Sequence, residues 1–152
     1  MTENQPRENI HQQQELFSEI APHYDFMNHL MTGWQDDRWR RFVIARARLP
    51  STGHLLDLGT GTGKLALEAR RQHPGIRITA ADITLPMMVQ GQKKRPSSSW
   101  YWIGAAAGSL PFEDDSFEAV ISGFLVRNLS NLPRGLTEQY RVLKPGGRAV
   151  IL

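Results

Sequence analysis

The sequence contains no cysteine among its 152 residues. Disulfide bonds, thiolate metal sites and a cysteine nucleophile are therefore excluded. Its five histidines show no spacing typical of metal ligands, and we expect no metal site. No apolar run approaches the roughly 18 residues that a membrane-spanning helix needs, and the polar N-terminus does not resemble a signal peptide. These absences predict a cytoplasmic protein, and the length of 152 residues predicts one compact domain.

The formal net charge is also small, at +3. Much of it lies in residues 38–48, RWRRFVIARAR, which we interpret as a helix. The apolar stripe of this helix would consist of Trp39, Phe42, Val43 and Ala47, with Arg40, Arg41 and Arg48 largely opposite. Such arginines usually keep a helix soluble, so we expect no nucleic-acid partner. Contact with lipid headgroups at a membrane surface, or with RNA, is the alternative interpretation.

The most informative segment is LLDLGTGTG, residues 55–63. It joins an apolar strand to a turn that contains Gly59, Gly61 and Gly63, with the acid Asp57 just before the first glycine. These glycines can adopt positive φ and have no Cβ to keep a ligand away from the backbone. A helix that begins directly after the turn would direct its positive N-terminal end into the same space. The segment therefore predicts a nucleotide-type pocket.

Spacing separates three candidate ligands. A P-loop ending at Gly63 would need glycine at Leu58 and a hydroxyl at Leu65. The dinucleotide fingerprint G-x-G-x-x-G finds Lys64 at its third glycine, where close helix packing requires no side chain. An acid followed by G-x-G-x-G suits S-adenosylmethionine better, because this ligand has no pyrophosphate and carries an ammonium that Asp57 can neutralise directly or through water. We therefore favour S-adenosylmethionine, and NAD remains the alternative.

A second acid, Asp82, ends the segment IRITAAD, residues 76–82. The segment reads as a buried strand, and it ends about twenty positions after the glycines. A carboxylate at this place can accept both hydroxyls of a ribose, which both cofactors contain. The alternative is that Asp82 caps a helix or forms a turn.

The order of segments predicts the fold class. Residues 10–48 read as two or three helices, and from residue 54 onward apolar strands alternate with helices. We expect an α/β domain with a parallel sheet, helices on both faces, and the ligand at the carboxyl ends of the strands. The predicted parts are a helical cap over residues 1–50 and a ligand-binding domain over residues 51–152.

The last helix should begin around Ser130, Asn131 and Pro133 and stop at residues 145–147, PGG. Its apolar stripe would consist of Leu136, Tyr140 and Leu143. The final segment RAVIL, residues 148–152, should be a fifth strand at the edge of the sheet. Because an edge strand is a template for pairing with another chain, we expect self-association through this edge, or else a sequence that is a fragment of a longer protein.

Several motifs together resemble one family. They are YDFMNHLM at residues 24–31 with the following Trp39, DLGTGTG, LPFEDDSFEAV, the pair Arg127 and Asn128, and YRVLKPGG. From about Leu16 to the last residue the chain is similar to the ubiquinone and menaquinone C-methyltransferases, the UbiE/MenG family. The resemblance implies a Rossmann-like class I methyltransferase fold whose doubly wound parallel sheet stops after the fifth strand. It also implies S-adenosylmethionine as methyl donor and a polyprenylated hydroquinone precursor as acceptor.

The resemblance assigns cofactor contacts in addition to the glycine turn. They fall on Thr62, Asp82, Ala106, Ala107 and Gly123. Relatives usually carry Asn or Asp at Ala106, where it can hold the adenine amino group, and serine at Gly123. Ala106 offers only its backbone, so we expect cofactor binding to be weaker by about 0.5 to 1.5 kcal/mol. Asp36 replaces a histidine of the N-terminal signature.

The implied chemistry assigns three further residues. Methyl transfer to an aromatic carbon requires an electron-rich ring, and a phenol with a pKa of about 10 is mostly neutral at working pH. We expect Arg127 to stabilise the developing oxyanion and Asn128 to orient the oxygen or a water. Tyr24 would line the acceptor pocket and help to exclude water. The alternative for Arg127 is an ion pair with an acid such as Asp25.

Three function classes follow. The first is an active methyltransferase that acts on a hydroquinone. The second is a binding module of the same fold without turnover, which Ala106 and Gly123 would permit. The third and least favoured is a NAD-dependent oxidoreductase.

Overall fold

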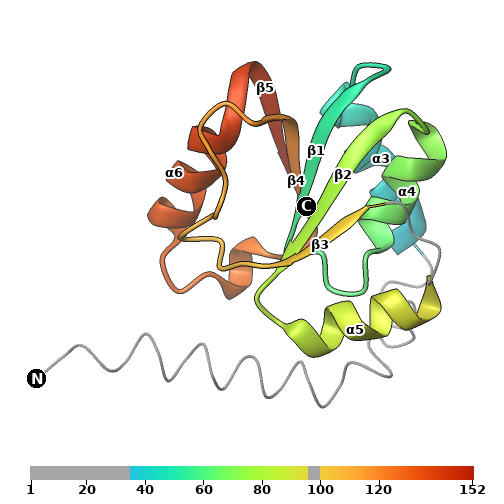
Figure 1. Cartoon of the computed structure of the whole chain (residues 1–152), viewed down its shortest axis with the longest axis horizontal. Helices are drawn as coiled ribbons and strands as arrows, with labels where there is room; N and C mark the ends of the chain where they lie inside the picture. The colour runs from blue at the N-terminus through green and yellow to red at the C-terminus, as the bar shows by residue number, and fades with distance from the viewer. Residues whose placement is uncertain (1–34, 96–99) are drawn as a thin grey trace, which may run out of the picture.

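The structure is a computed structural model that describes residues 35–95 and 100–152. Within these residues, five strands form one sheet in the order β3-β2-β1-β4-β5 (Figure 1). The strands are β1 (Gly53–Leu58), β2 (Ile76–Asp82), β3 (Tyr101–Gly104), β4 (Phe117–Ser122) and β5 (Leu143–Ile151). All neighbouring strands pair in parallel, so the predicted α/β class and parallel sheet are confirmed.

Helices cover both faces of the sheet. They are α3 (Asp36–Ala47), α4 (Lys64–Gln72), α5 (Leu85–Lys94), α6 (Leu132–Val142) and the short 3-10 helix η1 (Val126–Asn128). In Figure 1, α3 and α4 lie on one side of the sheet and α6 on the other. The strand order explains this, because β1 connects to β2 in one direction along the sheet and β4 connects to β5 in the opposite direction. Right-handed crossovers then place the helices on opposite faces.

Two apolar clusters fill the two faces. One cluster joins α3 and α4 to the sheet, and it includes Ile44 and Leu55. The other joins α6 and the loop before β4 to the opposite face, and it includes Leu56 and Val142. Leu55 and Leu56 face different clusters because side chains alternate along a strand. A strand covered on both faces can be apolar at consecutive positions, which accounts for the adjacent buried residues Leu55 and Leu56 of β1.

Our prediction for the buried face of α3 is confirmed for Val43 and Ala47, but it was wrong for Phe42 and for Arg40. Arg40 is buried, and Phe42 is 55% exposed. The apolar residues that α3 buries are Val43, Ile44 and Ala47. Arg40 can lie inside because Asp36, one turn earlier, is also buried and pairs with it. A hydrophobic pattern cannot reveal such a pair, since both of its members count as polar surface positions.

α6 also buries a different face from the stripe that we predicted. Its buried residues are Gly135, Gln139 and Val142. Leu136 and Tyr140 are 41% and 82% exposed. Leu129 packs against the helix at Gly135, where an added Cβ would approach Leu129 Cδ1 to 2.8 Å. The helix therefore meets the domain along a row that begins with a small residue, Gly135, and the larger residues Leu136 and Tyr140 face outward.

The residues predicted to stop α6 lie inside β5. The helix ends at Val142 with Leu143 as its C-cap, and the strand begins at that residue. β5 pairs with β4 at Leu143 opposite Phe117 and again at Arg148 opposite Ala119, so the residues between form an irregularity. Proline and glycine are tolerated at such a place because β5 is an edge strand in the described sheet.

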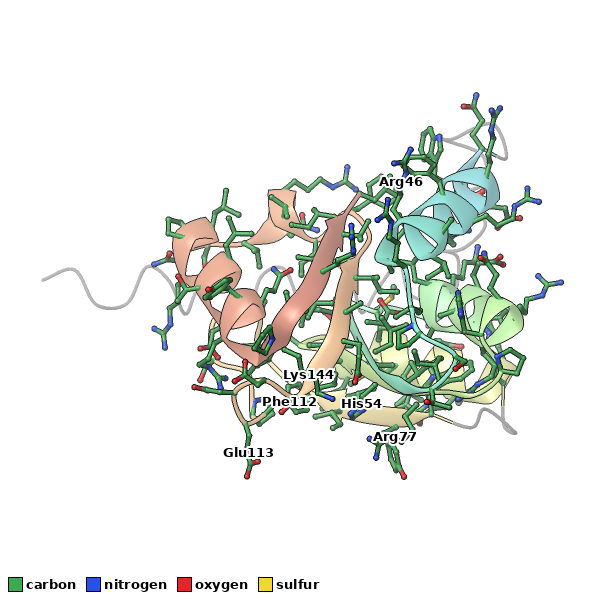
Figure 2. All side chains as sticks on the ribbon, turned by 90° about the horizontal axis from the view of Figure 1, so that it is seen from above. Arg46, His54, Arg77, Phe112, Glu113 and Lys144 are labelled. Carbon is green, nitrogen blue, oxygen red and sulfur yellow. The ribbon has the colours of Figure 1, made fainter. Side chains whose placement is uncertain are left out.

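The N-terminal ends of the strands lie opposite the end where we expect the ligand. There Glu118 of β4 accepts a hydrogen bond from the backbone N–H of His54 and pairs with Lys144 Nζ at 2.6 Å. His54 Nε2 lies 2.8 Å from Thr79 Oγ1. Figure 2 shows His54, Lys144 and Arg77 at this end of the sheet. Polar contacts therefore hold the N-terminal edge together.

The predicted helical cap, residues 1–50, lies largely outside the described residues, as do Tyr24 and Asp25. Its described part, α3, packs beside α4 in the first apolar cluster. None of the described helices has the length and apolar character needed to cross a membrane.

Candidate cofactor site

A cavity of about 510 Å³ opens at the carboxyl ends of the strands. Small-molecule sites typically measure roughly 300 to 1,000 Å³. Its walls come from the turn after β1, the segment after β2, the loop after β3, and the segment that runs from the end of β4 to the start of α6. The cavity therefore spans the point where the strand order reverses, between β1 and β4, which is the usual place for a ligand in such a sheet.

The glycine turn has the positive φ angles that we expected. They are +69° at Gly59, +56° at Gly61 and +80° at Gly63. Gly59 and Gly61 line the cavity, whereas Gly63 does not. Gly63 is the N-cap of α4 and faces Trp102, whose Cη2 would lie 2.6 Å from an added Cβ. The first two glycines thus expose backbone to the cavity, and the third allows close packing behind it.

Asp57 is fully buried behind the turn and does not line the cavity. Its Oδ2 accepts hydrogen bonds from Thr60 Oγ1 at 2.6 Å and from the backbone N–H of Ala66 at 3.0 Å. Its Oδ1 has no hydrogen-bond partner among the described residues. Burial raises the pKa of this carboxyl to about 7, because loss of water penalises the charged form. Asp57 would therefore act on a ligand across the turn or through water.

Asp82, at the end of β2, does line the cavity. Its Oδ2 accepts a hydrogen bond from the backbone N–H of Gly61 at 2.7 Å, and its Oδ1 accepts one from the N–H of Thr84 at 2.8 Å. Burial raises the pKa of this carboxyl as well. The bond to Thr84 is the turn interaction of our alternative interpretation. The bond to Gly61 fixes the glycine turn against the end of β2.

The loop after β3 contributes Ala106 and Ala107 to the cavity. The backbone N–H of Ser109 donates to the carbonyl of Ala106 at 3.0 Å, which closes a tight turn. This wall offers methyl groups and backbone atoms to a ligand. Thr62 lies outside the lining, and its carbonyl accepts a hydrogen bond from Arg95 Nη1 at 2.7 Å.

The segment after β4 holds the remaining predicted residues within the described part of the chain. Gly123 and Asn128 line the cavity, whereas Arg127 is exposed and does not. The Arg127 guanidinium lies 5.3 Å from the centroid of the Phe124 ring. Asn128 Nδ2 donates to the carbonyl of Phe124 at 3.2 Å. The two predicted catalytic residues of this segment, Arg127 and Asn128, thus both contact Phe124.

Phe124 is a cavity residue that the sequence analysis missed. It lines the cavity with φ of +58°, a conformation that bulky side chains seldom adopt. Trp39 of α3 contacts its ring edge-on, with the centroids 6.4 Å apart. Strained residues gather at functional sites. No sequence pattern marks this one, because its conformation depends on contacts with other segments.

Other cavity residues were missed because apolar residues were interpreted as core. Ile83, Met87, Leu125 and Leu129 all line the cavity. Arg134, in the first turn of α6, lines it too, and no other cationic side chain in the described part of the chain does. The sequence offered no signal for Arg134, because none of the motifs that we identified contains this residue.

Arg141, within the YRVLKPGG motif, ties α6 to the loop between β3 and β4. It pairs with Glu138 and Asp114, each at 2.8 Å. Its terminal nitrogens also donate to the carbonyls of Phe112 at 2.7 Å and Leu110 at 3.0 Å. Hydrogen bonds from Arg141 lower the pKa of Glu138 to about 2. The motif therefore has a structural role here, since it fixes one wall of the cavity to the helix.

Buried charges join α3 to the start of α4. Arg40 Nη2 lies 2.8 Å from Asp36 Oδ2, and Lys64 Nζ lies 3.9 Å from the same oxygen. Lys64 is the first residue of α4 and directly follows Gly63 of the turn. Asp36 is only 1% exposed, so it links the two helices at the end nearest the cavity.

We expect Asp36→Ala to lower the free energy of unfolding by about 2 kcal/mol, because it leaves Arg40 inside without its buried partner. The loss should be smaller than for an isolated buried pair, since Asp37 still pairs with Arg40 at 2.8 Å. Urea denaturation measures the effect. Asp37→Ala is the matched control, because it removes an exposed carboxylate from the same guanidinium and should cost less than about 1 kcal/mol. Equal losses in the two variants would contradict a special role for Asp36.

Comparison with known proteins identifies relatives along almost the whole chain. A model of the ubiE/COQ5 methyltransferase family matches residues 4–152. A ubiquinone/menaquinone biosynthesis C-methyltransferase UbiE of Desulfotalea psychrophila is 45% identical over 139 residues, which cover 91% of this chain and 56% of the relative. A demethylmenaquinone methyltransferase of Thermus thermophilus is 41% identical over 139 residues, which cover 90% and 63%. The chain thus spans 56% to 63% of the length of these relatives.

Solved structures agree on the fold. A phosphoethanolamine N-methyltransferase of Haemonchus contortus in complex with S-adenosyl-L-methionine superposes with a TM-score of 0.68 at 24% identity, over 75% of this chain and 27% of that one. This likeness concerns the fold, which is the Rossmann-like fold of the class I methyltransferases. Because the family model matches residues 4–152 and the relatives are more than 40% identical, the chain belongs to the ubiE/COQ5 methyltransferase family.

Proposed function

We propose that this chain is an S-adenosylmethionine-dependent C-methyltransferase that acts on a polyprenylated hydroquinone in menaquinone or ubiquinone biosynthesis. The observation that carries the proposal is the cavity in which Gly59, Gly61 and Asp82 meet, in a chain of the ubiE/COQ5 family. When bound, S-adenosylmethionine supplies a methyl group on a sulfonium, which an electron-rich carbon can accept.

The residues of the cavity fit this cofactor. Gly59 and Gly61 expose backbone without side chains, so a ligand can lie directly against the turn. Asp82 presents a carboxylate at the place where we expect the ribose. The unpartnered Oδ1 of Asp57 lies behind the same turn, and an ammonium nearby would favour its ionised form. A cavity of about 510 Å³ is large enough for a ligand of this size.

For the acceptor, the proposed roles are orientation by Asn128 and stabilisation of the oxyanion by Arg127. Asn128 lines the cavity, and Arg127 precedes it on η1 beside the Phe124 ring. A guanidinium keeps its charge at any working pH, and its field would favour ionisation of a phenol whose ordinary pKa is about 10. Since Arg127 does not line the cavity, this role requires its side chain to turn inward when the acceptor binds. Tyr24, the third proposed residue, lies outside the described residues.

A binding module of the same fold without turnover is the second candidate. Ala106 and Gly123, which both line the cavity, favour it because neither carries the polar side chain that relatives usually have there. A NAD-dependent oxidoreductase is the third candidate. It is disfavoured because Lys64, at the start of α4, occupies the position where the dinucleotide fingerprint needs a glycine.

Calorimetry tests the cofactor. We expect binding of S-adenosylmethionine and of its demethylated product, S-adenosylhomocysteine, and no binding of NAD. The opposite pattern would refute the proposal. Incubation with labelled S-adenosylmethionine and a short-chain demethylated hydroquinone then separates the enzyme from the module. Transfer of the label is expected, and binding without transfer would favour the module.

A homo-oligomer that pairs through β5 is part of the proposal. β5 is an edge strand with most of its residues exposed, and α6 beside it exposes Leu132, Leu136 and Tyr140. An open strand edge next to apolar side chains is a template for a second copy of the chain. Light scattering should therefore find a dimer or a larger species, and a monomer free of aggregation would rule this out.

A cytoplasmic protein with peripheral membrane contact fits the same proposal, because a polyprenylated acceptor resides in a membrane. The exposed residues Arg41 and Arg48 of the arginine-rich segment are available for lipid headgroups. Arg40 is not, since it is buried in its pair with Asp36.

A further inference from the structure

Arg134 combines a place in the cavity with free hydrogen-bonding capacity. Its backbone N–H donates to Oδ1 of Asn131, the N-cap of α6, at 3.0 Å. Its side-chain Nε donates to the carbonyl of Gly108 at 2.6 Å. Within residues 35–95 and 100–152, its two terminal nitrogens have no hydrogen-bond partner. Arg134 is therefore anchored through one nitrogen, and its other donors are available to a ligand in the cavity.

The strand order determines which part of the bound cofactor lies near this guanidinium. β2 lies between β1 and β3. A ligand with its methionine part at the turn after β1 and its ribose at Asp82 must therefore extend its base over the loop after β3. That loop contributes Ala106, Ala107 and Gly108 to the cavity, and Arg134 is bonded to the last of them. Arg134 thus stands at the base end of the proposed cofactor.

We propose that Arg134 binds the purine of the cofactor and determines which purine the site accepts. This inference rests on the proposed function. The wall formed by Ala106 and Ala107 carries no side-chain acceptor for the adenine amino group, whereas Arg134 brings donors. An arginine fork gives two hydrogen bonds to a purine with an oxygen at position 6, through that oxygen and N7. Adenine has an amino group at position 6, so the same fork can give only one bond, to a ring nitrogen.

The site should therefore accept a 6-oxopurine unusually well. The test measures by calorimetry the dissociation constants of S-adenosylhomocysteine and of its 6-oxo analogue, S-inosylhomocysteine, for the full chain. We expect Arg134→Gln to weaken binding of S-adenosylhomocysteine by about three- to tenfold. Binding of the 6-oxo analogue should weaken by about a further fivefold, because two bonds are lost. Arg134→Lys keeps the charge but loses the planar fork, so the ratio of the two constants should shift as in Arg134→Gln.

Two further variants complete the test. One is a negative control, and the other should shift the preference in the opposite direction. Arg77→Gln removes the same charge from an exposed residue at the opposite end of β2 (Figure 2), and it should leave both dissociation constants unchanged within about twofold. Ala106→Asp adds an acceptor for the amino group and should shift the ratio toward adenine. Because Arg134 is exposed, Arg134→Gln should keep the melting temperature of the parent.

The outcomes separate this inference from the function on which it rests. If the parent chain binds S-adenosylhomocysteine and Arg134→Gln leaves the ratio of the two constants unchanged, Arg134 does not read the purine, and the proposed function stands. If Arg134→Gln changes only the KM for the hydroquinone, Arg134 belongs to the acceptor and the inference is overturned. If the parent chain binds no S-adenosylhomocysteine, the proposed function fails, and this inference fails with it.

Discussion

Gly63→Ala is expected to lower the free energy of unfolding by about 2 to 5 kcal/mol, as measured by urea denaturation. Two separate costs add. The φ of +80° at this position is unfavourable for any residue with a Cβ, by about 1 to 2 kcal/mol. The new Cβ would also lie 2.6 Å from Trp102 Cη2. That ring atom cannot easily move toward Gly91, where an added Cβ would lie 2.7 Å from it, and overpacking of this kind costs about 1 to 3 kcal/mol.

Gly146→Ala is a closely matched control. Gly146 also has φ of +80°, but an added Cβ would meet nothing within 4 Å. This variant should therefore show the backbone cost alone, about 1 to 2 kcal/mol. The difference between the two variants measures the contact between the turn and Trp102. If both variants lose the same stability, the turn is limited by its φ angle and Trp102 does not constrain it.

Asp57→Asn should make the unliganded protein more stable at pH 8 and bind the cofactor more weakly. The folded pKa of Asp57 is raised from 3.8 to about 7, so between these values the folded protein holds a proton that the unfolded chain has lost. Stability then falls as pH rises through this range, and the loss is complete above about pH 7. The shift corresponds to at most about 4 kcal/mol. An uncharged isostere removes this cost and keeps an acceptor for Thr60 Oγ1 and the Ala66 N–H.

Urea denaturation of the parent and of Asp57→Asn at pH 5.5 and pH 8 measures this effect. The difference in stability between the two proteins should change with pH, even though other groups titrate. The pKa of Asp82 is also raised by burial, and that of His54 is lowered by burial, but both contributions are present in both proteins. Asp115→Asn serves as the control, because it removes an exposed carboxylate and should leave the pH dependence of stability unchanged. A parallel pH dependence in Asp57→Asn and its parent would show that Asp57 is already ionised at low pH.

Asp57→Asn should also change the affinity for the cofactor product and the pH dependence of that affinity. Loss of a buried negative charge behind the turn should weaken binding of S-adenosylhomocysteine by about tenfold at pH 8, because its ammonium then lacks a counter-charge. The parent should bind more tightly as pH rises from 6 to 8, whereas Asp57→Asn should not. Unchanged affinity in Asp57→Asn would mean that the carboxylate only organises the turn through Thr60 and Ala66.

Much of the site could be predicted from local sequence. The glycine turn and the acid at the end of β2 were found because backbone sterics and strand periodicity are local properties. We predicted that Asp57 acts on the ligand directly or through water, and the sequence could not distinguish these two possibilities because it shows the position of Asp57 in the strand but not the depth of its burial. Arg127 was selected from the family resemblance, and Arg134 was not considered, because the sequence does not show how η1 and α6 pack around the cavity.

By itself, the sequence determined the parallel sheet, the helices that connect its strands and the end of the sheet at which the cavity opens. Two patterns are sufficient for this prediction, the alternation of apolar strands with helices and the glycine turn after the first strand. Both patterns depend only on residues that are close together in the sequence. Only the tertiary structure decided which charged groups are buried, which face of α6 packs inward, and which cation reaches the cavity. Burial and proximity arise from contacts between segments distant in sequence, such as α3 with α4 and the loop after β3 with α6.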